Sequence, residues 1–548
     1  MNWFRKICSN LTLKSHWFIL LVSIYFTFAL NCAFWRFIFD TVEITNFSVF
    51  IFALSLPFFT LAPVYAFCNL LTVPYMGKPL LIFFLIISSA ANYFMYKLGI
   101  YIDADMVRNT FETNAREAFD LITFNSILWV FITGVIPAAL VAFTKVQYST
   151  WGKEIIKRLL CILLTIFIIT GFAAASYKEY VSFGRNNRDA RKILNTVNYT
   201  YSTFRYVQKQ LAADKQFKKL DENALLVPFA DPHPTVLILI LGETARAKNF
   251  SLYGYEKETN PLLKKQDIVV FDEVISCGTS TAVSVPCMFS NMGRSYFDAT
   301  NAKYTENLLD LLQNVGYKIL WLDNDDGCKG VCDRVETRKM VKINNPKYCK
   351  KDYCYDEALL DGLPEILANI KEDTVIILHT MGSHGPTYYN RYPDEFKKFT
   401  PTCDTADIQN CTREQIINTY DNTILYTDYI VSSAIDMLKA HPGYEAGLIY
   451  VSDHGESLGE GGVYLHGLPY KLAPREQIHV PMILWMSDTM KRWDYVDYDC
   501  LKKEAKTNIY THDNLFHSIV GLLEVKTAVY KKDYDLFKNC RTKELFSE

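Results

Sequence analysis

Apolar residues dominate the first 177 positions of the chain, and an ordinary globular pattern follows them. Five apolar runs approach the roughly 20 residues that a membrane-spanning helix needs. The runs cover residues 17–39, 48–72, 80–98, 122–143 and 159–175. No small-residue cleavage site follows the first run, so the run is not interpreted as a removable signal peptide. The pattern predicts a five-helix transmembrane domain over residues 1–177.

Basic residues flank these runs unevenly. They cluster before the first run and between the last two, at Arg5, Lys6, Lys14, Lys145, Lys153, Lys157 and Arg158. The loop between the third and fourth runs is acidic instead. Because cytoplasmic loops carry the excess of Lys and Arg, the N-terminus is expected in the cytoplasm. Five crossings then place everything after about residue 178 on the opposite side of the membrane.

From about residue 234, apolar runs of strand length alternate with helical stretches. The runs cover residues 235–241, 317–322, 374–378, 447–451 and 481–485. Continuous apolar strands separated by helices are typical of a parallel sheet buried on both faces. Residues 229–548 are therefore expected to form an α/β domain with a mostly parallel central sheet covered by helices. The polar residues 178–228 are predicted to bridge the two domains, either as a solvated linker or as amphipathic helices at the membrane surface.

Ten of the fourteen cysteines lie in this second part of the chain. An even number in close pairs fits an oxidising compartment. The predicted disulfides are Cys277–Cys287, Cys328–Cys332, Cys349–Cys354 and Cys403–Cys411, with Cys500–Cys540 as the remaining pair. The alternative, a structural zinc site at Cys328, Cys332, Cys349 and Cys354, is disfavoured by the irregular spacing. Topology and cysteines together indicate a multi-pass bacterial inner-membrane protein with a periplasmic domain. The net charge of -2 argues against a nucleic-acid partner.

Polar residues gather where four of the predicted strands end. Glu243 follows the first strand, Asp323 and Asp325 follow the second, His379 to His384 follow the third, and Asp453 with His454 follows the fourth. A single carboxylate in such a place is more often a helix cap or a loop residue. Ligands of open α/β sheets bind at the carboxyl ends of the strands. Four such ends in one sheet therefore indicate a functional site.

Mixed carboxylate and imidazole ligands suit zinc. Glu243, Asp453 and His454 make three protein ligands. The segment bracketed by Cys277 and Cys287 offers four hydroxyls, at Thr279, Ser280, Thr281 and Ser284. A hydroxyl needs a base or a metal to act as a nucleophile, and a bound zinc ion would lower the pKa of the alcohol. Any of these hydroxyls, that of Thr281 among them, is a candidate for the fourth ligand.

Further histidines and one lysine are candidates for the same site. His384 and His466 are each expected to bind a second metal ion, to hold a phosphate oxygen or to protonate a leaving group. Lys329, inside the Cys328–Cys332 loop, is either a partner for phosphate charge or an exposed surface lysine. His479, His512 and His517 lack a comparable strand-end position, so they are interpreted as mostly structural.

Together these motifs resemble the alkaline phosphatase and sulfatase superfamily. More closely, they resemble the membrane-bound phosphoethanolamine transferases that modify lipid A and include colistin-resistance enzymes. The matching segments are Gly242-Glu-Thr-Ala-Arg-Ala-Lys-Asn249, the segment from Cys277 to Cys287, Met381-Gly-Ser-His-Gly-Pro386 and Ser452-Asp-His-Gly-Glu-Ser-Leu-Gly459. The sulfatase pattern of Cys or Ser followed by x-Pro-x-Arg is absent at Thr281, which disfavours sulfatase chemistry.

The resemblance implies roles for individual residues. Thr281 would be the nucleophile, and Glu243, Thr281, Asp453 and His454 would hold zinc. His384, His466 and Lys329 would contact the phosphoethanolamine phosphate or a second zinc ion bound during turnover. Asp325, at a position where relatives carry Asn, would contact the headgroup or be neutral.

The resemblance also implies an activity. The expected reaction moves phosphoethanolamine from phosphatidylethanolamine to a lipid A phosphate through a covalent intermediate on Thr281. Resistance to polymyxins and other cationic peptides would follow, and the enzyme is expected to be a monomer. The alternatives are the same transfer to a core sugar of lipopolysaccharide or a surface glycan, a membrane-anchored phosphodiesterase, and a non-catalytic membrane scaffold.

Overall fold

The chain divides into two compact units. The structure is a computed structural model, and it describes residues 12–113, 115–187, 190–213, 215–227, 233–325, 327–350, 353–493, 495–543 and 545. Arg5 and Lys6, used above for orientation, lie outside the described residues. The first unit contains residues 1–107 and 122–207, and the second contains residues 108–121 and 208–548. The domain boundaries predicted at 177 and 228 stay predictions.

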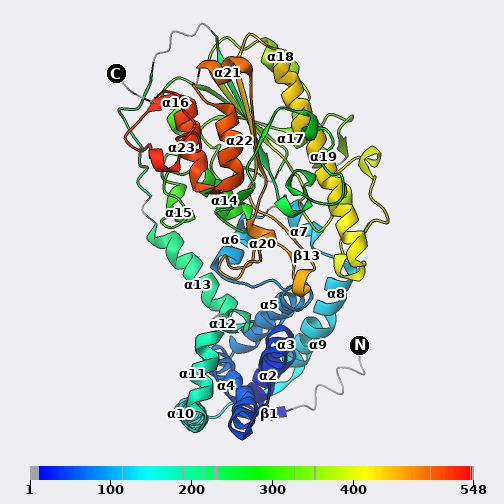
Figure 1. Ribbon diagram of the computed structural model, residues 1–548. Helices are drawn as coiled ribbons and strands as arrows, with labels where there is room; N and C mark the ends of the chain where they lie inside the picture. Colours follow the sequence, from blue (N-terminus) through cyan, green and yellow to red (C-terminus); the bar gives the residue numbers. More distant parts are fainter. Residues whose placement is uncertain are drawn as a thin grey trace. The chain divides into compact units, whose positions relative to one another are not determined.

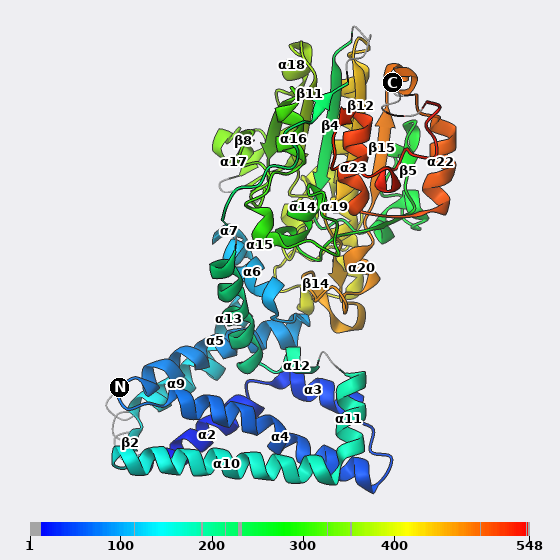
Figure 2. The ribbon, with the colours of Figure 1, turned by 90° about the vertical axis from the view of Figure 1, so that its left-hand side faces the viewer.

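The first unit is built from helices (Figure 1 and Figure 2). They are α2 (Ser15–Phe28), α3 (Cys32–Thr41), α4 (Phe47–Leu71), α5 (Gly77–Leu98), α8 (Phe124–Val130), the π-helical turn Phe131–Val135, α9 (Ile136–Phe143), α10 (Trp151–Ala175), α11 (Tyr177–Asn186), α12 (Ala190–Ile193) and α13 (Val197–Ala212). A short strand β1 (Thr12–Lys14) pairs in parallel with β2 (Lys145–Gln147). The predicted bridging segment is therefore helical up to Ala212, and its described residues after that form no helix. Its position at a membrane surface stays a prediction.

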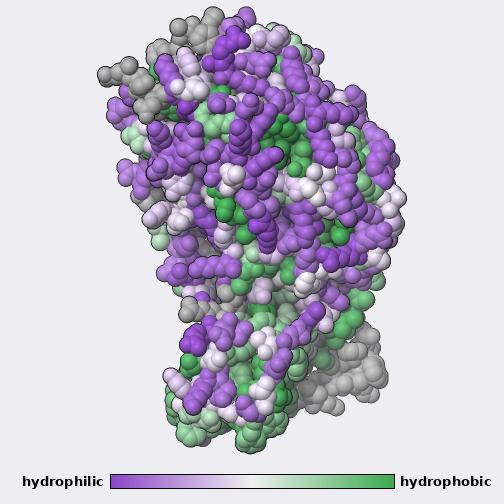
Figure 3. Space-filling view, in the orientation of Figure 1, coloured by the Kyte–Doolittle hydropathy of each residue, from purple (hydrophilic) through white to green (hydrophobic). Residues whose placement is uncertain are grey.

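Four helical spans in the described residues are long and apolar enough to cross a membrane. They are Phe47–Leu71, Gly77–Leu98, Phe124–Phe143 and Trp151–Ala175, and the bent pair α2 and α3 makes a fifth if it counts as one span. Large apolar side chains lie exposed along them, and Phe167 in α10 has 77% of its surface exposed. Figure 3 shows such residues in green in the lower part of the view. Exposed apolar surface on this scale is typical of a protein that contacts a membrane.

The first predicted span is not one straight helix. α2 and α3 meet at an angle of 58°. Asn31 lies at the break, and its side-chain Nδ2 donates to the carbonyl of Phe26 at 2.7 Å. Its Oδ1 accepts from the backbone N–H of Asn195 at 2.7 Å. Asn side chains compete with the helical backbone for hydrogen bonds, which explains why the apolar run is interrupted here.

The last span begins earlier than the apolar run predicts. α10 begins at Trp151, whereas the predicted run begins at residue 159. The added turns contain Lys153, Glu154, Lys157 and Arg158. Lys, Glu and Arg are good helix formers, and Glu154 pairs with Arg158 one turn later at 3.3 Å. Hydropathy detects the apolar part of a helix and misses the charged turns that extend it.

A seven-stranded sheet forms the centre of the second unit (Figure 2). Its order is β5 (Val269–Val270), β15 (Met482–Met486), β12 (Glu445–Ser452), β4 (Thr235–Gly242), β11 (Thr374–His379), β7 (Lys318–Asp323) and β8 (Glu336–Lys339). β15 runs antiparallel to β12 and to β5, and the other neighbours are parallel. The predicted mostly parallel sheet is confirmed. The direction of β15 and the short edge strands β5 and β8 were not predicted, because an apolar run carries no information on strand direction.

Helices and small strand pairs surround this sheet. The helices are α6 (Ala104–Glu112), α7 (Ala115–Asp120), α14 (Thr281–Met288), α15 (Ala299–Ala302), α16 (Leu308–Asn314), α17 (Met340–Ile343), α18 (Leu363–Ala368), α19 (Arg413–Lys439), α20 (Arg475–Ile478), α21 (Asp488–Trp493), α22 (Tyr498–Thr507) and α23 (Asp513–Leu522). The pairs are β3 (Leu225–Leu226) with β17 (Val525–Lys526), β6 (Glu273–Ile275) with β16 (Ile509–Thr511), β9 (Cys349–Lys350) with β10 (Tyr353–Cys354), and β13 (Ser457–Leu458) with β14 (Tyr464–Leu465).

Both faces of the sheet are buried. Leu237, Leu239 and Leu241 of β4 pack in one cluster with apolar residues of α14, α16, α22 and α23. The alternate residues Ile238 and Ile240, which point to the other face, are equally buried. The helices therefore cover the faces, and the carboxyl edge of the parallel strands is left for polar residues.

The five predicted disulfides are all present in the second unit. They are Cys277–Cys287, Cys328–Cys332, Cys349–Cys354, Cys403–Cys411 and Cys500–Cys540. The alternative of a structural zinc site at Cys328, Cys332, Cys349 and Cys354 is therefore wrong, because these sulfurs are bonded in pairs.

The disulfides differ in how much chain they close, which predicts unequal contributions to stability. Cys500–Cys540 joins residues 40 apart, and Cys328–Cys332 joins residues 4 apart. Because loop closure restricts the unfolded chain more for longer loops, replacing both Cys500 and Cys540 by Ala should cost about 2 kcal/mol more than the same change at Cys328 and Cys332. Denaturant unfolding of the two double variants measures the difference. An equal or reversed loss would contradict the loop-length explanation.

Candidate active site

The parallel register of the sheet brings the predicted site residues to one edge. Gly242 at the end of β4 pairs with Ser452 at the end of β12. Leu241 of β4 pairs with His379 at the end of β11. Glu243 and Asp453 follow directly, so both carboxylates leave the sheet side by side. Each of these strands is apolar and is followed by a polar residue. Because the strands pair in parallel, these polar residues lie together at one edge of the sheet.

Thr281 lies at the first position of α14, where Ser280 caps the helix in an extended conformation. Its hydroxyl Oγ1 is 3.1 Å from both carboxylate oxygens of Glu243. The same Oγ1 is 3.4 Å from Nε2 of His454. The N-terminus of a helix favours negative charge, so this position suits an oxygen that reacts with a phosphate group. The predicted nucleophile therefore contacts two of the three other predicted ligands, Glu243 and His454.

Glu243, Asp453 and His454 form a buried group whose ligand atoms all lie within 4.8 Å of one another. Nδ1 of His454 is 2.9 Å from the carbonyl of Gly455. A carbonyl can only accept, so Nδ1 carries a proton, and Nε2 is the ring nitrogen that can serve as a ligand. That Nε2 lies 3.4 Å from Glu243 Oε1 and 3.4 Å from Asp453 Oδ2.

The group contains more acceptors than donors. Among the described residues, the buried Oδ2 of Asp453 has no hydrogen-bond partner. Burial and the neighbouring carboxylates of Asp453 and Asp325 raise the pKa of Glu243 well above its ordinary value. Buried carboxylates are ordinarily paired or coordinate a metal. The donor set of two carboxylates and one imidazole therefore fits a zinc ion.

The segment from Cys277 to Cys287, which carries the predicted nucleophile Thr281, is called the nucleophile turn. Hydrogen bonds hold it to the end of β12. The backbone N–H of Cys277 donates to Nδ1 of His512 at 3.1 Å. Nε2 of His512 donates to the carbonyl of Ser452 at 3.0 Å. Burial of His512 lowers its pKa to about 4, so the ring is neutral and can accept on one nitrogen and donate on the other. His512 joins the turn that carries Thr281 to the strand that carries Asp453.

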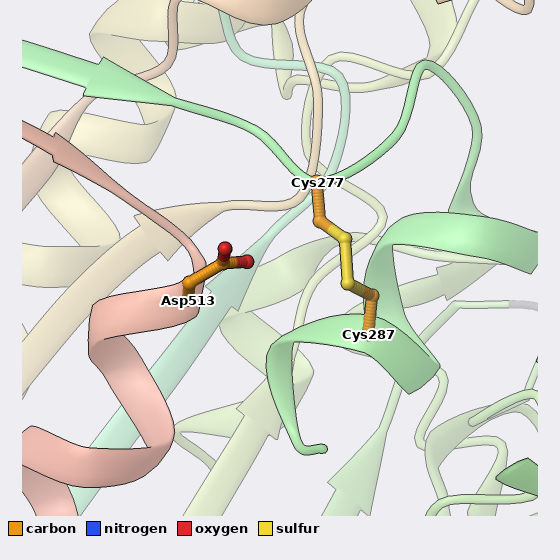
Figure 4. Close-up of side chains that lie close together, drawn as sticks. All are labelled: Cys277, Cys287 and Asp513. Atoms are coloured by element: carbon orange, nitrogen blue, oxygen red, sulfur yellow. A yellow bond between two sulfur atoms is a disulfide. The ribbon is translucent and has the colours of Figure 1, made fainter. Parts of the chain in front are cut away.

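The Cys277–Cys287 disulfide ties both ends of the same turn, and Asp513 lies beside it (Figure 4). The three residues come close enough to resemble a metal-binding group. The two sulfurs are bonded to each other, however, and Oδ1 of Asp513 accepts from the backbone N–H of Arg294 at 2.8 Å. Arg294 in turn bonds to the carbonyl of Cys277 and lies over the ring of Tyr470. This cluster is a structural support for the nucleophile turn.

His384 and His466 lie next to the buried group. The rings of His466 and His454 are 4.4 Å apart between centroids, and those of His466 and His384 are 5.5 Å apart. Nδ1 of His466 bonds to Oε2 of Glu456 at 2.8 Å. The hydroxyl of Tyr388 donates to the other oxygen of Glu456 at 2.6 Å. Burial lowers the pKa of His466, so the ring is neutral and Nε2 carries a lone pair.

The loop that carries His384 is fixed by a buried carboxylate. Asp356 accepts from the backbone N–H groups of Met381 at 2.8 Å and Gly382 at 2.9 Å. The N–H of Ser383 donates to the carbonyl of Glu243 at 3.0 Å. Gly382 has a positive φ of 52°, and a Cβ added there would lie 2.6 Å from that carbonyl oxygen. Only glycine lets the loop approach Glu243 this closely.

The remaining predicted residues differ in their distance from the group. Oδ2 of Asp325 lies 3.5 Å from Nε2 of His379, and both come within 4.8 Å of Glu243. Lys329 is half-buried and lies in a hollow with Pro286, Ser290 and Glu306, beside the C-terminal half of α14. Asp325 therefore adjoins the candidate site, and the phosphate contact predicted for Lys329 stays a prediction.

Sequence reasoning placed His379 and Glu456 in strand-end segments and interpreted His512 as mostly structural, but it gave none of them a specific contact, and it missed Asp356. His379 bonds to Asp323 at 2.9 Å. Burial opposes its charge, but Asp323 and Asp325 outweigh burial and raise the pKa of His379 to about 9. His379 and Glu456 stand in the strand-end segments, so their position was a usable signal. Asp356 and His512 carry no such signal, because each acts only through contacts with distant segments.

Comparison with known proteins identifies the family. The family model described as Phosphoethanolamine transferase EptA/EptB matches residues 60–211, and the model described as Sulfatase matches residues 235–525. The phosphoethanolamine transferase EptA of Escherichia coli strain K12 is 42% identical over 527 residues, covering 95% of this chain and 96% of that protein. The chain belongs to the EptA/Mcr family of phosphoethanolamine transferases. The predicted resemblance is confirmed.

Two further members extend the likeness over nearly the whole chain. The phosphatidylethanolamine transferase Mcr-1 of Escherichia coli is 36% identical over 548 residues and covers 98% of each chain. The integral membrane lipooligosaccharide phosphoethanolamine transferase A (EptA) of Neisseria meningitidis has the same fold, with a TM-score of 0.94 and 37% identity. The match covers 97% of this chain and 100% of that one. This EptA/Mcr family member therefore shares both the helical and the sulfatase-like parts with a membrane-embedded relative.

The depressed pKa of His512 predicts a dependence of stability on pH. Between its unfolded value of about 6.5 and its folded value of about 4, the unfolded chain binds a proton that the folded chain excludes. The free energy of unfolding should therefore fall as the pH falls through this window, by on the order of 3 kcal/mol from this residue. His512→Asn keeps an acceptor for Cys277 and does not titrate. Denaturant unfolding at several pH values should give a shallower slope for His512→Asn, and parallel curves would refute the assignment.

Proposed function

We propose that the protein transfers phosphoethanolamine from phosphatidylethanolamine to a phosphate of lipid A, through a covalent phosphoethanolamine intermediate on Thr281. The observation that carries the proposal is the contact of the Thr281 hydroxyl with Glu243 and His454 at the N-terminus of α14. The related enzyme of Neisseria meningitidis is named for a lipooligosaccharide acceptor, which supports a lipid-linked saccharide as the acceptor here.

The metal proposed for this site is zinc. Glu243, Asp453 and His454 would hold it together with Thr281, since the unpartnered Oδ2 of Asp453 lies 3.4 Å from Nε2 of His454 in the same buried group. When bound, zinc would lower the pKa of the Thr281 hydroxyl and offset charge on the transferring phosphoryl group. His384 and His466 are suited to a second ion or to phosphate oxygens.

The first half of the reaction follows from these positions. Glu243 accepts a hydrogen bond from the Thr281 hydroxyl and orients Oγ1. Oγ1 forms a bond to phosphorus, and the bond from phosphorus to the diacylglycerol oxygen breaks. The proton that Thr281 loses is the proton that diacylglycerol gains. His466 is neutral, with its Nδ1 proton held by Glu456, so Nε2 is suited to carry this proton.

In the second half, a lipid A phosphate oxygen displaces Thr281 from phosphorus. The bond from phosphorus to Thr281 Oγ1 breaks, and Oγ1 takes up the proton that the attacking phosphate group of lipid A loses. The product carries an added ethanolammonium group. That positive charge offsets lipid A phosphate charge and weakens the binding of polymyxins and other cationic peptides.

The location follows from the same reaction. Both lipids lie in a membrane, and the apolar helices of the first unit would anchor the chain in it. The disulfides of the second unit favour the oxidising periplasm, with the N-terminus in the cytoplasm. We expect the protein to work as a monomer, since one chain can supply every residue of the proposed steps.

Removal of the nucleophile tests the transfer. Thr281→Ala should abolish phosphoethanolamine on lipid A in cells that express the protein, a loss of at least about a hundredfold. Thr281→Ser keeps a hydroxyl and should retain measurable transfer. Mass spectrometry of extracted lipid A measures both.

Two results of that experiment would overturn parts of the proposal. Transfer that survives in Thr281→Ala refutes the nucleophile. Lipid A that stays unmodified while a core sugar or another glycan gains phosphoethanolamine refutes the acceptor.

Removal of one ligand tests the metal. Asp453→Asn should reduce zinc bound to the purified protein by at least about tenfold, since losing even a group that hydrogen-bonds to a metal ligand can cost this much. Asp513→Asn is the matched control, because Asp513 also lies beside the nucleophile turn but outside the proposed ligand set. Elemental analysis after dialysis measures the zinc. Equal zinc in wild type and Asp453→Asn would contradict the assignment.

A further inference from the structure

The segment between the third and fourth apolar helices belongs to the catalytic unit. Residues 108–121 group with residues 208–548, although both ends of the segment continue along the chain into apolar helices of the first unit. Polar contacts attach the segment to this unit. Arg108 Nη2 donates to Thr300 Oγ1 at 2.9 Å, and Glu112 Oε1 lies 2.6 Å from Lys303 Nζ. Asp120, at the end of α7, makes the contacts that reach furthest into the site.

Asp120 binds Thr387 and Arg391, which come after His384 in the same loop. Its Oδ2 accepts from Arg391 Nη2 at 2.9 Å and from Thr387 Oγ1 at 2.9 Å. The same guanidinium donates from Nη2 to Thr387 Oγ1 at 3.0 Å and from Nε to the carbonyl of His384 at 2.8 Å. Asp120, Thr387 and Arg391 thus form a closed hydrogen-bonded set whose last member is the backbone of His384.

Burial makes this set depend on the carboxylate. Arg391 is only 6% exposed, and a buried guanidinium needs a charge partner. Among the residues that the structure describes, Asp120 is the carboxylate within ion-pair distance of Arg391. Without Asp120, the Arg391 guanidinium would be a buried charge with no ion-pair partner. We expect it to turn toward solvent and to lose its hydrogen bond to the His384 carbonyl.

The backbone of His384 is held from two sides. Asp356 fixes Met381 and Gly382 ahead of it, and Arg391 holds its carbonyl behind it. The His384 ring lies against His466, which lies against His454. A small displacement of the His384 backbone therefore moves a side chain at the reaction centre, and misplacement by about 1 Å can cost up to about a hundredfold in rate.

We propose that Asp120 is a positioning residue for the transfer reaction: through Arg391, it fixes the backbone of His384 in the orientation that catalysis needs. This inference rests on the proposed function, because it assigns His384 to the reacting phosphate group. Asp120 contributes from a segment that lies outside the sulfatase-like part of the sequence. The catalytic site is complete only when the interspan segment is attached to it.

A purely structural ion pair is the competing explanation, and the same segment supplies the control. Glu112 lies in the same segment as Asp120 and pairs with Lys303. It has no described contact with the His384 loop. Asp120→Ala and Glu112→Ala each remove one carboxylate from the segment. If the pairs only stabilise the fold, the two variants should behave alike.

The experiment uses the full chain in detergent–phospholipid micelles, with phosphatidylethanolamine as donor and lipid A as acceptor. Asp120→Ala should lower kcat about tenfold and change the KM for the donor less than about threefold, whereas Glu112→Ala should keep the wild-type kcat. Asp120→Glu, which keeps the charge, should restore part of the loss. In an Arg391→Ala background, Asp120→Ala should have little further effect, because the two residues act through one contact.

A second measurement separates this inference from the proposed function. Hydrogen exchange of the backbone amides in residues 381–392 should be faster in Asp120→Ala than in Glu112→Ala, whatever the reaction is. Equal kcat in the two variants, or equal exchange in this loop, would overturn the positioning role. If wild type transfers nothing to lipid A while the exchange difference is found, the proposed function fails and the link from Asp120 to the loop stands.

Discussion

The convergence of three buried acceptors at one edge of the sheet is the constraint on which the rest of the structure depends. The ligand atoms of Glu243, Asp453 and His454 lie within 4.8 Å of one another and away from solvent. Burying a carboxylate costs several kcal/mol unless a cation or hydrogen-bond donors compensate. The parallel pairing of β4 with β12 forces the two carboxylates together, and Asp453 Oδ2 lacks an internal donor among the described residues. The folded chain therefore keeps two carboxylates buried close together, and a bound cation would compensate for the free energy that their burial costs.

Such a cluster stays in position only because its surroundings are rigid. His512 joins the nucleophile turn to β12, Glu456 orients His466, and Asp356 fixes the His384 loop. Each of these residues is buried and bonds to more than one segment of the chain. The side chains of the candidate site are therefore held as rigidly as the sheet itself. A site built on strand ends and locked by a second set of hydrogen bonds can hold reacting groups within a few tenths of an ångström. The disulfide at Cys277 adds a covalent tie to the same turn.

The two units differ in which side chains they expose and in how they are stabilised. The first unit exposes apolar side chains and satisfies its few internal polar groups with one another, as Asn31 does with Asn195. The second unit buries a mixed sheet and adds disulfides, which suits a domain outside the cytoplasm. Residues 108–121 interrupt this division, because they are flanked by apolar helices and attached to the catalytic unit. Attachment of this segment gives an enzyme of membrane lipids a direct contribution from its interspan loop.

The sequence by itself determined the elements and most of the chemical inventory. Apolar period and length predicted the spans and the strands, and polar residues at strand ends predicted Glu243, Asp453 and His454. Whether these lie in contact was decided by strand pairing, and the antiparallel direction of β15 left no trace in its apolar run. The contact of Asn31 with Asn195, the role of His512 and the pair of Asp120 with Arg391 also came only from the tertiary structure. The physical reason is that these contacts join residues more than 150 positions apart, and local periodicity carries no information on such partners.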